Sequence, residues 1–352
     1  MRPLIVATSE PTSRAADEPR AHDSPRVDYV ELSRRCATQY VDYGVGGHNR
    51  ILRRLEDSLR LDIGLALQAA RTIGNDGYGA ILSMSERVGI PLGLLLGHRV
   101  RHVLFAHHLL SPPKLGLIKA LGIAPRWDLI IVHTHAEREE AQRLLHLGAE
   151  RVHMLFGNVD CRFYRPVPDQ MLHQRDYILS LGLAERDYST LITALRKLPY
   201  VTCYIGMNSL WIKSAGGNGA GRLPRNVLMQ PYLPATTIRD RYDKCRFVVV
   251  SLRSPTTHWS AGISTVMVAQ AMGKAVIATD NPGMRSYIAH GDTGLLVRGA
   301  DAEAMAEAIE YLWNRPEEAS AMGHRARLWA ESKYSLDLWL DNVSRLIETL
   351  VP

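Results

Sequence analysis

The stretch SAGISTVMVAQAMGKAVIATD, residues 260–280, indicates the fold of the chain. A turn rich in glycine and serine opens a helical segment, which should end at Gly273 and lead into a strand. Gly262 and Ser264 are a small residue and an N-cap type that helix starts favour, and Gly273 suits the left-handed position after a helix. The apolar run at 275–278 is typical of a strand buried on both faces of a parallel sheet.

The start of this predicted helix is a candidate anion site. The first backbone N–H groups of a helix have no partner within the helix, and the helix dipole places partial positive charge there. A phosphate group fits such a position. The same pattern also describes an ordinary connection between a helix and a strand, so residues 260–280 alone leave both interpretations open.

The length and composition indicate two domains of ordinary size that face a cleft. A chain of 352 residues is too long for a single compact core. Its hydrophobic content of 46% and charged content of 22% are typical of a globular protein and exclude low-complexity classes. The start, MRPLIVATSE, predicts a strand and not a signal peptide, and no stretch is apolar enough to span a membrane. We therefore expect a cytoplasmic protein.

The cysteines and the net charge narrow the classes of ligand. The four cysteines have no CxxC spacing, so we predict neither a zinc site nor a disulfide framework. The formal net charge of +6 is spread along the chain and is compatible with a phosphorylated ligand, an anionic membrane surface or nucleic acid. We expect no nucleic acid, because no RNA-binding aromatic motif, zinc finger or helix-turn-helix accompanies the charge.

The N-terminal half predicts a parallel sheet covered by helices. Strands are expected at residues 4–8, 28–32, 80–84, 103–106, 129–133 and 152–156, and helices at 49–59, 61–73, 89–96, 115–121 and 136–147. Strands that alternate with helices indicate a doubly wound α/β domain, whose ligands lie at the carboxyl ends of the strands. The polar segment 11–25 is expected to form an exposed loop.

The pattern restarts after a predicted linker at residues 166–175. Strands are expected at 177–182, 201–205, 227–229, 247–252, 275–278 and 294–297, and helices at 188–197, 235–242, 302–314, 316–332 and 336–350, with a glycine-rich loop at 215–223. This half is predicted to be a second doubly wound α/β domain. The last helix is amphipathic with an acidic polar face, which favours packing on the N-terminal domain over membrane binding.

Three segments of the C-terminal half carry a recognisable pattern. They are GNVDCRFYRP at 157–166, ILSLGLAERDYSTLITAL at 178–195 and GKAVIATDNPGMRSYIAHGDTGLLV at 273–297. The first resembles the domain-closing motif P-x-G-V-D-x-x-x-F-x-P of the retaining glycosyltransferases of family 4, also called glycosyl transferases group 1. The second resembles that family's strand, glycine and basic residue before a helix, and the third its GKPVVATD and DGxTGLLV segments. The N-terminal half resembles the family only in its rhythm.

The resemblance implies a GT-B fold, in which two Rossmann-like domains face a cleft. Residues 1–165 would bind the acceptor, residues 176–335 the nucleotide sugar, and the helix at 336–352 would return to the N-terminal domain. The implied activity is transfer of a sugar from a nucleoside diphosphate sugar to a hydroxyl of a small-molecule, glycan or lipid-linked acceptor, with retention of configuration. Such an enzyme would serve carbohydrate or natural-product biosynthesis.

The resemblance also implies that no cofactor and no divalent metal are needed. The chain lacks the Asp-x-Asp pair whose hard oxygen ligands commonly hold Mg²⁺ or Mn²⁺ in sugar transferases. The expected partners are a nucleotide-sugar donor and a hydroxylated acceptor, with at most peripheral membrane contact, and a homodimer remains open. A basic face formed by Arg50, Arg53, Arg54 and Lys114 would favour a lipid-linked acceptor.

A donor site in the C-terminal domain follows from the resemblance. Arg186 stands where the family has a phosphate-binding lysine, and arginine can hold a phosphate through two parallel hydrogen bonds. Leu183 replaces the other basic residue of the family's pair. The remaining implied contacts are Gly262, Ile263, Ser264 and Thr265 for the diphosphate, Ser260 and Ala261 for the donor sugar, and Tyr232, Leu233 and Val268 for the nucleobase and ribose.

Two positions in this site depart from the family. Its Glu-x7-Glu pair aligns with Ser260 and Val268, and neither residue is acidic. Gln270 lies about 200° further round the helix than Val268 and should face elsewhere. Loss of a charge-assisted hydrogen bond costs about 1.5 to 3 kcal/mol, which is enough to weaken donor binding roughly ten- to hundredfold. The alternative is therefore a non-enzymatic or donor-impaired GT-B protein that acts as a binding or partner subunit.

Candidates for catalysis and acceptor binding follow the N-terminal strands. The family often has a histidine near the donor sugar, and the sequence does not choose between His107 and His108. A carboxylate base is not required if the leaving phosphate takes the acceptor's proton. Glu86, Gly46, Gly47 and His135 are further candidates for acceptor contact. The alternatives are N-caps for the helices that begin after Ser85 and Thr134, and a plain turn or hinge at residues 44–47.

Overall fold

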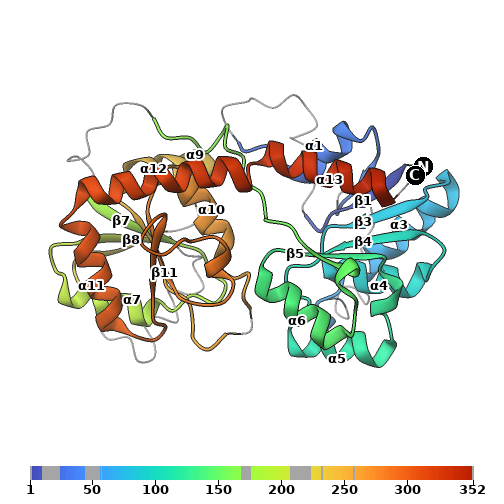
Figure 1. The fold of residues 1–352 in the computed structure, drawn as a ribbon, viewed down its shortest axis with the longest axis horizontal. Coiled ribbons are helices and arrows are strands. Elements are labelled where there is room, and N and C mark those ends of the chain that lie inside the picture. The colour runs from blue at the N-terminus through green and yellow to red at the C-terminus, as the bar shows by residue number, and fades with distance from the viewer. Residues whose placement is uncertain are drawn as a thin grey trace. The chain divides into compact units, whose positions relative to one another are not determined.

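The computed structural model describes residues 2–9, 24–43, 56, 58–167, 176–206, 223–230, 233–256 and 258–350. The chain forms two compact units, shown in Figure 1. Unit 1 consists of Met1–Arg20, Arg26–Phe156 and Asp337–Pro352, and unit 2 consists of Ala21–Pro25 and Gly157–Leu336. The chain thus passes between the units at Phe156 and Gly157, earlier than the linker expected at 166–175.

Unit 1 is built on a sheet of six parallel strands in the order β2-β1-β3-β4-β5-β6. The strands are β1 (Pro3–Val6), β2 (Tyr40–Val41), β3 (Ala80–Ser83), β4 (Arg101–Phe105), β5 (Leu129–Val132) and β6 (Val152–Met154). Strands β1, β3 and β5 are buried along their whole length, as expected for a parallel sheet covered on both faces.

Helices cover this sheet (Figure 1), and their apolar side chains pack with it in two core clusters. The helices are α1 (Asp28–Arg35), α3 (Ile63–Asp76), α4 (Glu86–Leu96), α5 (Pro112–Leu121), α6 (His135–Leu145) and α13 (Leu336–Leu350). Apolar side chains of α3 and α4 pack with β1 and β3 in one cluster. In the other cluster, Ile118 of α5 and Ala141 of α6 pack with β4, β5 and Trp127.

The prediction of a strand at 28–32 is wrong, because this segment begins helix α1. Tyr29, Val30, Leu32 and Ser33 are buried, and this spacing marks one face of a helix. Acidic residues lie in the first turn and basic residues in the last, where each sign suits the helix dipole. The second strand of the chain is β2, which follows the helix.

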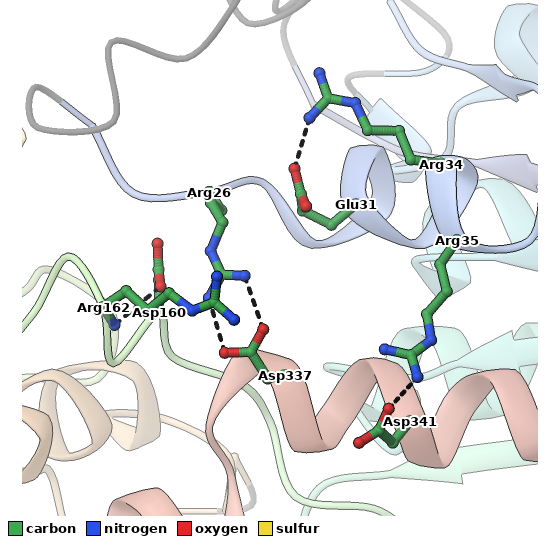
Figure 2. A network of polar contacts seen from close by, with 8 residues as sticks. All are labelled: Arg26, Glu31, Arg34, Arg35, Asp160, Arg162, Asp337 and Asp341. Atoms are coloured by element: carbon green, nitrogen blue, oxygen red, sulfur yellow. Dashed lines mark hydrogen bonds and ion pairs between the residues drawn. The ribbon is translucent and has the colours of Figure 1, made fainter.

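Helix α13 packs on unit 1, as the sequence predicted. Its Trp339 is buried, with the ring centroid 5.8 Å from that of Phe105 at the end of β4. Asp337 accepts hydrogen bonds of 2.9 and 3.1 Å from the guanidinium of Arg26. Asp341, one turn further along, forms an ion pair with Arg35 of α1 (Figure 2). An aromatic contact and two ion pairs therefore join the C-terminal helix to the N-terminal part of the chain.

Unit 2 has a second sheet of six parallel strands, in the order β12-β11-β10-β7-β8-β9. The strands are β7 (Tyr177–Leu181), β8 (Thr202–Gly206), β9 (Val227–Gln230), β10 (Val248–Val250), β11 (Val276–Thr279) and β12 (Gly294–Val297). Strands β10 and β11 are buried throughout, so the apolar run of the opening stretch is the expected internal strand. Both units are doubly wound α/β domains.

The helices of unit 2 lie within a few residues of their predicted bounds. They are α7 (Tyr188–Lys197), α9 (Ala235–Lys244), α10 (Ile263–Ala271), α11 (Ala302–Trp313) and α12 (Pro316–Lys333). One core cluster includes Leu191 of α7, Ile309 of α11 and Met322 of α12 together with Ile277 of β11 and Phe247, which directly precedes β10. Gly273 has φ +65°, the left-handed conformation predicted after helix α10.

Some predicted segments lie largely outside the described residues. They are the helix at 49–59 and the loops at 11–25 and 215–223. Within the described ranges, a membrane-crossing helix is not found, because none combines the necessary length and apolar character.

Candidate functional site

In the sheet of unit 2, the direction in which successive strands are added reverses between β7 and β10. Strands β8 and β9 extend the sheet on one side of this point, and β11 and β12 extend it on the other. Doubly wound sheets bind ligands at the carboxyl ends of the strands at such a switch point. Arg186 lies in the connection after β7, and helix α10 follows β10. The topology therefore brings Arg186 and the head of α10 together.

The head of α10 is built on a glycine. Gly262 is the N-cap residue, with φ +85°, so the N-cap is not Ser264, which lies exposed in the first turn. A Cβ atom at position 262 would lie 2.9 Å from Cγ1 of Val250 and 3.2 Å from Nη1 of Arg186. Conformation and space thus both require glycine here. Among the described side chains, none caps this end of the helix.

One expected diphosphate contact at this helix head already has a partner. The Ile263 N–H donates a 3.3 Å hydrogen bond to the backbone oxygen of Ser260. Thr265 is also engaged, because its hydroxyl oxygen accepts a hydrogen bond from Arg186. The amides around Gly262 and Ser264 are therefore better placed to meet an anion than that of Ile263.

Arg186 is a buried cation, 6% exposed, beside the head of α10. Its Nε donates to the Leu181 backbone oxygen at 3.0 Å, Nη1 to that of Ala184 at 3.1 Å and Nη2 to the Thr265 hydroxyl at 2.8 Å. All three acceptors are uncharged. Burial lowers the pKa of Arg186, and the pKa of the neighbouring Tyr188 phenol is raised by burial to about 12, so the phenol is neutral. Within the described part of the chain, no carboxylate bonds to this guanidinium.

A polar pair that was not predicted from the sequence lies beside this site. Glu185 has φ +55°, a left-handed conformation that is uncommon for residues other than glycine. Its Oε1 lies 3.4 Å from Nδ1 of His258, in the loop before α10. The backbone oxygen of Glu185 accepts a hydrogen bond from the Arg253 N–H at 2.9 Å. The available signal was an acidic residue directly before the expected phosphate-binding arginine.

The other predicted donor residues are placed less closely. Val268 is half-buried on α10 and Ala261 is buried. Leu233 lies before α9, after strand β9, which β8 separates from β7. Gln270 faces elsewhere, as predicted: its Nε2 donates to the Tyr287 backbone oxygen at 3.0 Å. Tyr232 lies outside the described residues.

Unit 1 places a buried carboxylate at the carboxyl edge of its sheet. Glu86, in the first turn of α4 after β3, is 1% exposed. Its Oε1 lies 2.5 Å from Nζ of Lys114, and its Oε2 accepts the His107 backbone N–H at 2.9 Å. Burial alone would raise the pKa of Glu86, but Lys114 and His107 together outweigh burial and lower it to about 2. The carboxylate is thus fully charged at neutral pH.

The structure separates the two candidate histidines. The His107 side chain is exposed, and its Nδ1 lies 3.2 Å from Nε2 of His133, a residue that the sequence analysis missed. His108 is half-buried. His135 is exposed in the first turn of α6. The residues that follow β3, β4 and β5 at this edge therefore include Glu86, His107 and His133.

The N-cap interpretations of two helix starts are confirmed. The Ser85 hydroxyl accepts the Arg87 N–H at 3.2 Å, and the Thr134 hydroxyl accepts the Glu137 N–H at 3.0 Å. Gly46 and Gly47, the other acceptor candidates, lie outside the described residues, as do Arg50, Arg53 and Arg54. A search of the described ranges finds no group of three His, Cys, Asp or Glu side chains that could hold a metal ion.

Comparison with known sequences points to sugar transferases. Residues 220–329 match the model of the family Glycosyl transferases group 1. A D-inositol 3-phosphate glycosyltransferase of Thermobispora bispora is 23% identical in an alignment 303 residues long, which covers 75% of this chain and 68% of that protein. The capsular polysaccharide biosynthesis glycosyltransferase CapM of Staphylococcus aureus is 30% identical over 95 residues, 27% of this chain and 25% of that protein.

Comparison with solved structures covers nearly the whole chain. HepE of Anabaena, in complex with UDP and glucose, has a TM-score of 0.74 at 14% identity over 99% of both chains. Sucrose-phosphate synthase of Thermosynechococcus elongatus has a TM-score of 0.73 at 16% identity, also over 99% of both chains. At such identities the likeness shows the fold. The chain therefore has the GT-B fold, and its residues 220–329 match the model of the family Glycosyl transferases group 1.

Proposed function

We propose that this chain moves a sugar from a nucleoside diphosphate sugar to a hydroxyl acceptor, with retention of configuration and without a divalent metal. The observation that carries this proposal is the Arg186 guanidinium, which is buried at the head of α10 and bonded to uncharged groups. A diphosphate would supply the missing negative charge. It would also accept hydrogen bonds from the amides at the helix start.

The donor is proposed to bind unit 2. Arg186 and the amides of Gly262 and Ser264 would hold the diphosphate, while the Thr265 hydroxyl orients the guanidinium. The sugar would lie near Ser260 and Ala261, as the family pattern implies. Glu185 lies in the same connection as Arg186, so it offers the carboxylate that positions 260 and 268 lack.

The acceptor is proposed to bind unit 1, at the carboxyl edge where Glu86, His107 and His135 lie. Glu86 is held by Lys114 and is too strong an acid to remove a proton from a hydroxyl. This supports transfer in which the leaving diphosphate takes the acceptor's proton. Small molecules, glycans and lipid-linked sugars all carry hydroxyls that fit this chemistry.

A second candidate function is binding without transfer. Ser260 and Val268 are uncharged where the family has glutamates, and this observation favours a donor-impaired GT-B protein that acts as a binding or partner subunit. The two candidates differ in turnover and share the diphosphate site at Arg186.

Calorimetric titration with UDP, GDP and ADP, followed by incubation with their sugar conjugates, separates the candidates. A transferase binds at least one nucleotide and releases it from the matching donor, with a retained anomeric configuration seen by NMR and no effect of EDTA. Binding without release of nucleotide, at any acceptor offered, supports the second candidate. If none of the three nucleotides binds, the proposed donor site at Arg186 is wrong, and so are both candidate functions that depend on it.

The matched variants for this experiment are Arg186→Ala and Arg225→Ala. Arg225 is an exposed arginine of the same unit in the turn before β9. Arg186→Ala should weaken nucleotide binding roughly ten- to hundredfold, the effect of one or two lost charge-assisted hydrogen bonds. Arg225→Ala should leave the affinity unchanged.

A further inference from the structure

Two histidines of unit 1 form a hydrogen-bonded chain between two backbone carbonyls. Nε2 of His107 lies 3.0 Å from the oxygen of Met84, and Nδ1 of His107 lies 3.2 Å from Nε2 of His133. Nδ1 of His133 lies 3.1 Å from the oxygen of Leu155. These four residues follow β3, β4, β5 and β6, which are adjacent in the sheet.

The number of protons in this chain follows from its ends. A backbone carbonyl only accepts hydrogen bonds, so Nε2 of His107 and Nδ1 of His133 must each carry a proton. The two inner nitrogens, which face each other, share a third proton. Two neutral imidazoles carry only two ring protons in total, so three protons make one of the rings an imidazolium.

The surroundings decide which ring carries the charge. His133 is buried, and burial, with a smaller contribution from His107, lowers its pKa to about 3. Its ring is therefore neutral, with the proton on Nδ1. His107 is exposed, and the Glu86 carboxylate, shared with Lys114, accepts its backbone N–H. The Glu137 carboxylate also lies at this point and accepts the His133 backbone N–H at 3.3 Å.

We propose that His133 is a positioning residue that holds the His107 ring in a fixed orientation with a proton on both nitrogens. His107 is then a fixed positive charge at the carboxyl edge of the sheet. A ring without a free lone pair cannot act as a base, so His107 attracts an anionic group of a substrate, such as a phosphate. The catalytic importance of this charge rests on the proposed function, whereas the protonation of the ring does not.

NMR of the intact chain labelled with ¹⁵N in histidine tests the proposal without any need for activity. At pH 7 we expect two protonated ring nitrogens for His107 and one, Nδ1, for His133, assigned by comparison with His107→Gln and His133→Phe. In His133→Phe the ratio of charged to neutral His107 should fall at least about tenfold at the same pH, because the second ring proton of His107 loses its hydrogen-bond acceptor. His153→Gln, an exposed histidine of β6, should leave the His107 signals unchanged.

A single ring proton on His107 in the wild-type chain at pH 7 would overturn the proposal, and this result does not depend on whether any variant folds. Unchanged His107 protonation in a folded His133→Phe chain would also overturn it. Two further titrations identify the anion: a nucleoside diphosphate and a sugar monophosphate. If His133→Phe weakens only the first, the charge serves the donor, and if it weakens only the second, it serves a phosphorylated acceptor. Equal affinities of the variant and wild type for both would contradict the role in anion binding.

Discussion

The two units hold a buried charge in opposite ways. In unit 1, Glu86 is matched by Lys114 and by the His107 backbone N–H, so its charge is compensated within the fold. In unit 2, Arg186 is almost as buried, but its partners are two carbonyls and a hydroxyl. Burial of a charge costs free energy unless an opposite charge is near. The difference indicates that Glu86 stabilises the fold, and it supports our proposal that Arg186 binds the diphosphate of the donor.

The largest effect is expected for Glu86→Ala. This change leaves Lys114, whose side chain is only 12% exposed, without its partner, and breaking a buried pair costs about 3 to 5 kcal/mol of unfolding free energy. Chemical denaturation measures the loss. The control is Glu140→Ala on α6, which breaks a partly exposed pair with Arg143 and should have a much smaller effect. Equal losses would show that Glu86 is not a structural charge.

The stability of unit 1 should depend on acid pH through the same residue. The pKa of Glu86 is lowered from 4.5 to about 2 in the fold, so its stabilisation is complete above about pH 4.5 and is lost as the pH falls towards 2. The loss is about 3 kcal/mol, at 1.36 kcal/mol per pH unit. Denaturation curves from pH 5 to 2 should show this loss of unfolding free energy in the wild type. Glu86→Gln has no carboxyl group at this position, so its unfolding free energy should lack this dependence on pH. Arg186 keeps its charge across this range and adds no such dependence.

Gly262→Ala sharpens the comparison on the side of unit 2. A second glycine, Gly291, has a similar φ of +80° but open space around its Cβ position. Alanine in the left-handed region costs roughly 1 to 2 kcal/mol, and crowding against Val250 and Arg186 should add about 1 kcal/mol or more at position 262 alone. Denaturation measures both costs. The affinity for a nucleotide should fall in Gly262→Ala and stay unchanged in Gly291→Ala. An equal fall in both variants would mean that the loss of affinity does not come from crowding against Arg186.

The smallest effect is expected for Asp341→Ala. Its ion pair with Arg35 joins α13 to α1, but both side chains are nearly half exposed. Exposed pairs contribute below about 1 kcal/mol, and salt screens them. Denaturation in low and high salt should show a small loss that disappears in high salt. If the loss of unfolding free energy were as large as that of Glu86→Ala, ion pairing, and not burial, would determine how much a charge of unit 1 stabilises the fold.

Hydrophobic periodicity predicted most of the fold, because strands buried on both faces and amphipathic helices leave clear patterns. It failed at residues 28–32, where a short apolar run fits a strand and a helix alike. The cap of α10 fell on Gly262 and not on Ser264, since the space beside Arg186 and Val250 decides that position.

The contacts of the candidate site were less predictable than its elements. Arg186 and the head of α10 were found from motifs, but their hydrogen bonds depend on β7 and β10 being neighbours. His133 was missed because a histidine inside an apolar strand pattern gives no sign of its partner on the next strand. Glu185 was missed because the sequence shows an acidic residue before Arg186, but neither the left-handed backbone at that residue nor its contact with His258.

The free energy of unfolding, measured with and without a nucleoside diphosphate, tests the role of Arg186 most directly. At a nucleotide concentration of about 100 times its dissociation constant, the wild type should gain about 2.7 kcal/mol. Arg186→Ala should gain less than about 0.5 kcal/mol at the same concentration if its affinity falls hundredfold, and its unliganded stability should stay close to that of the wild type. Arg225→Ala should behave as the wild type does. Equal stabilisation of Arg186→Ala and the wild type by the nucleotide would show that this buried cation is not the diphosphate site.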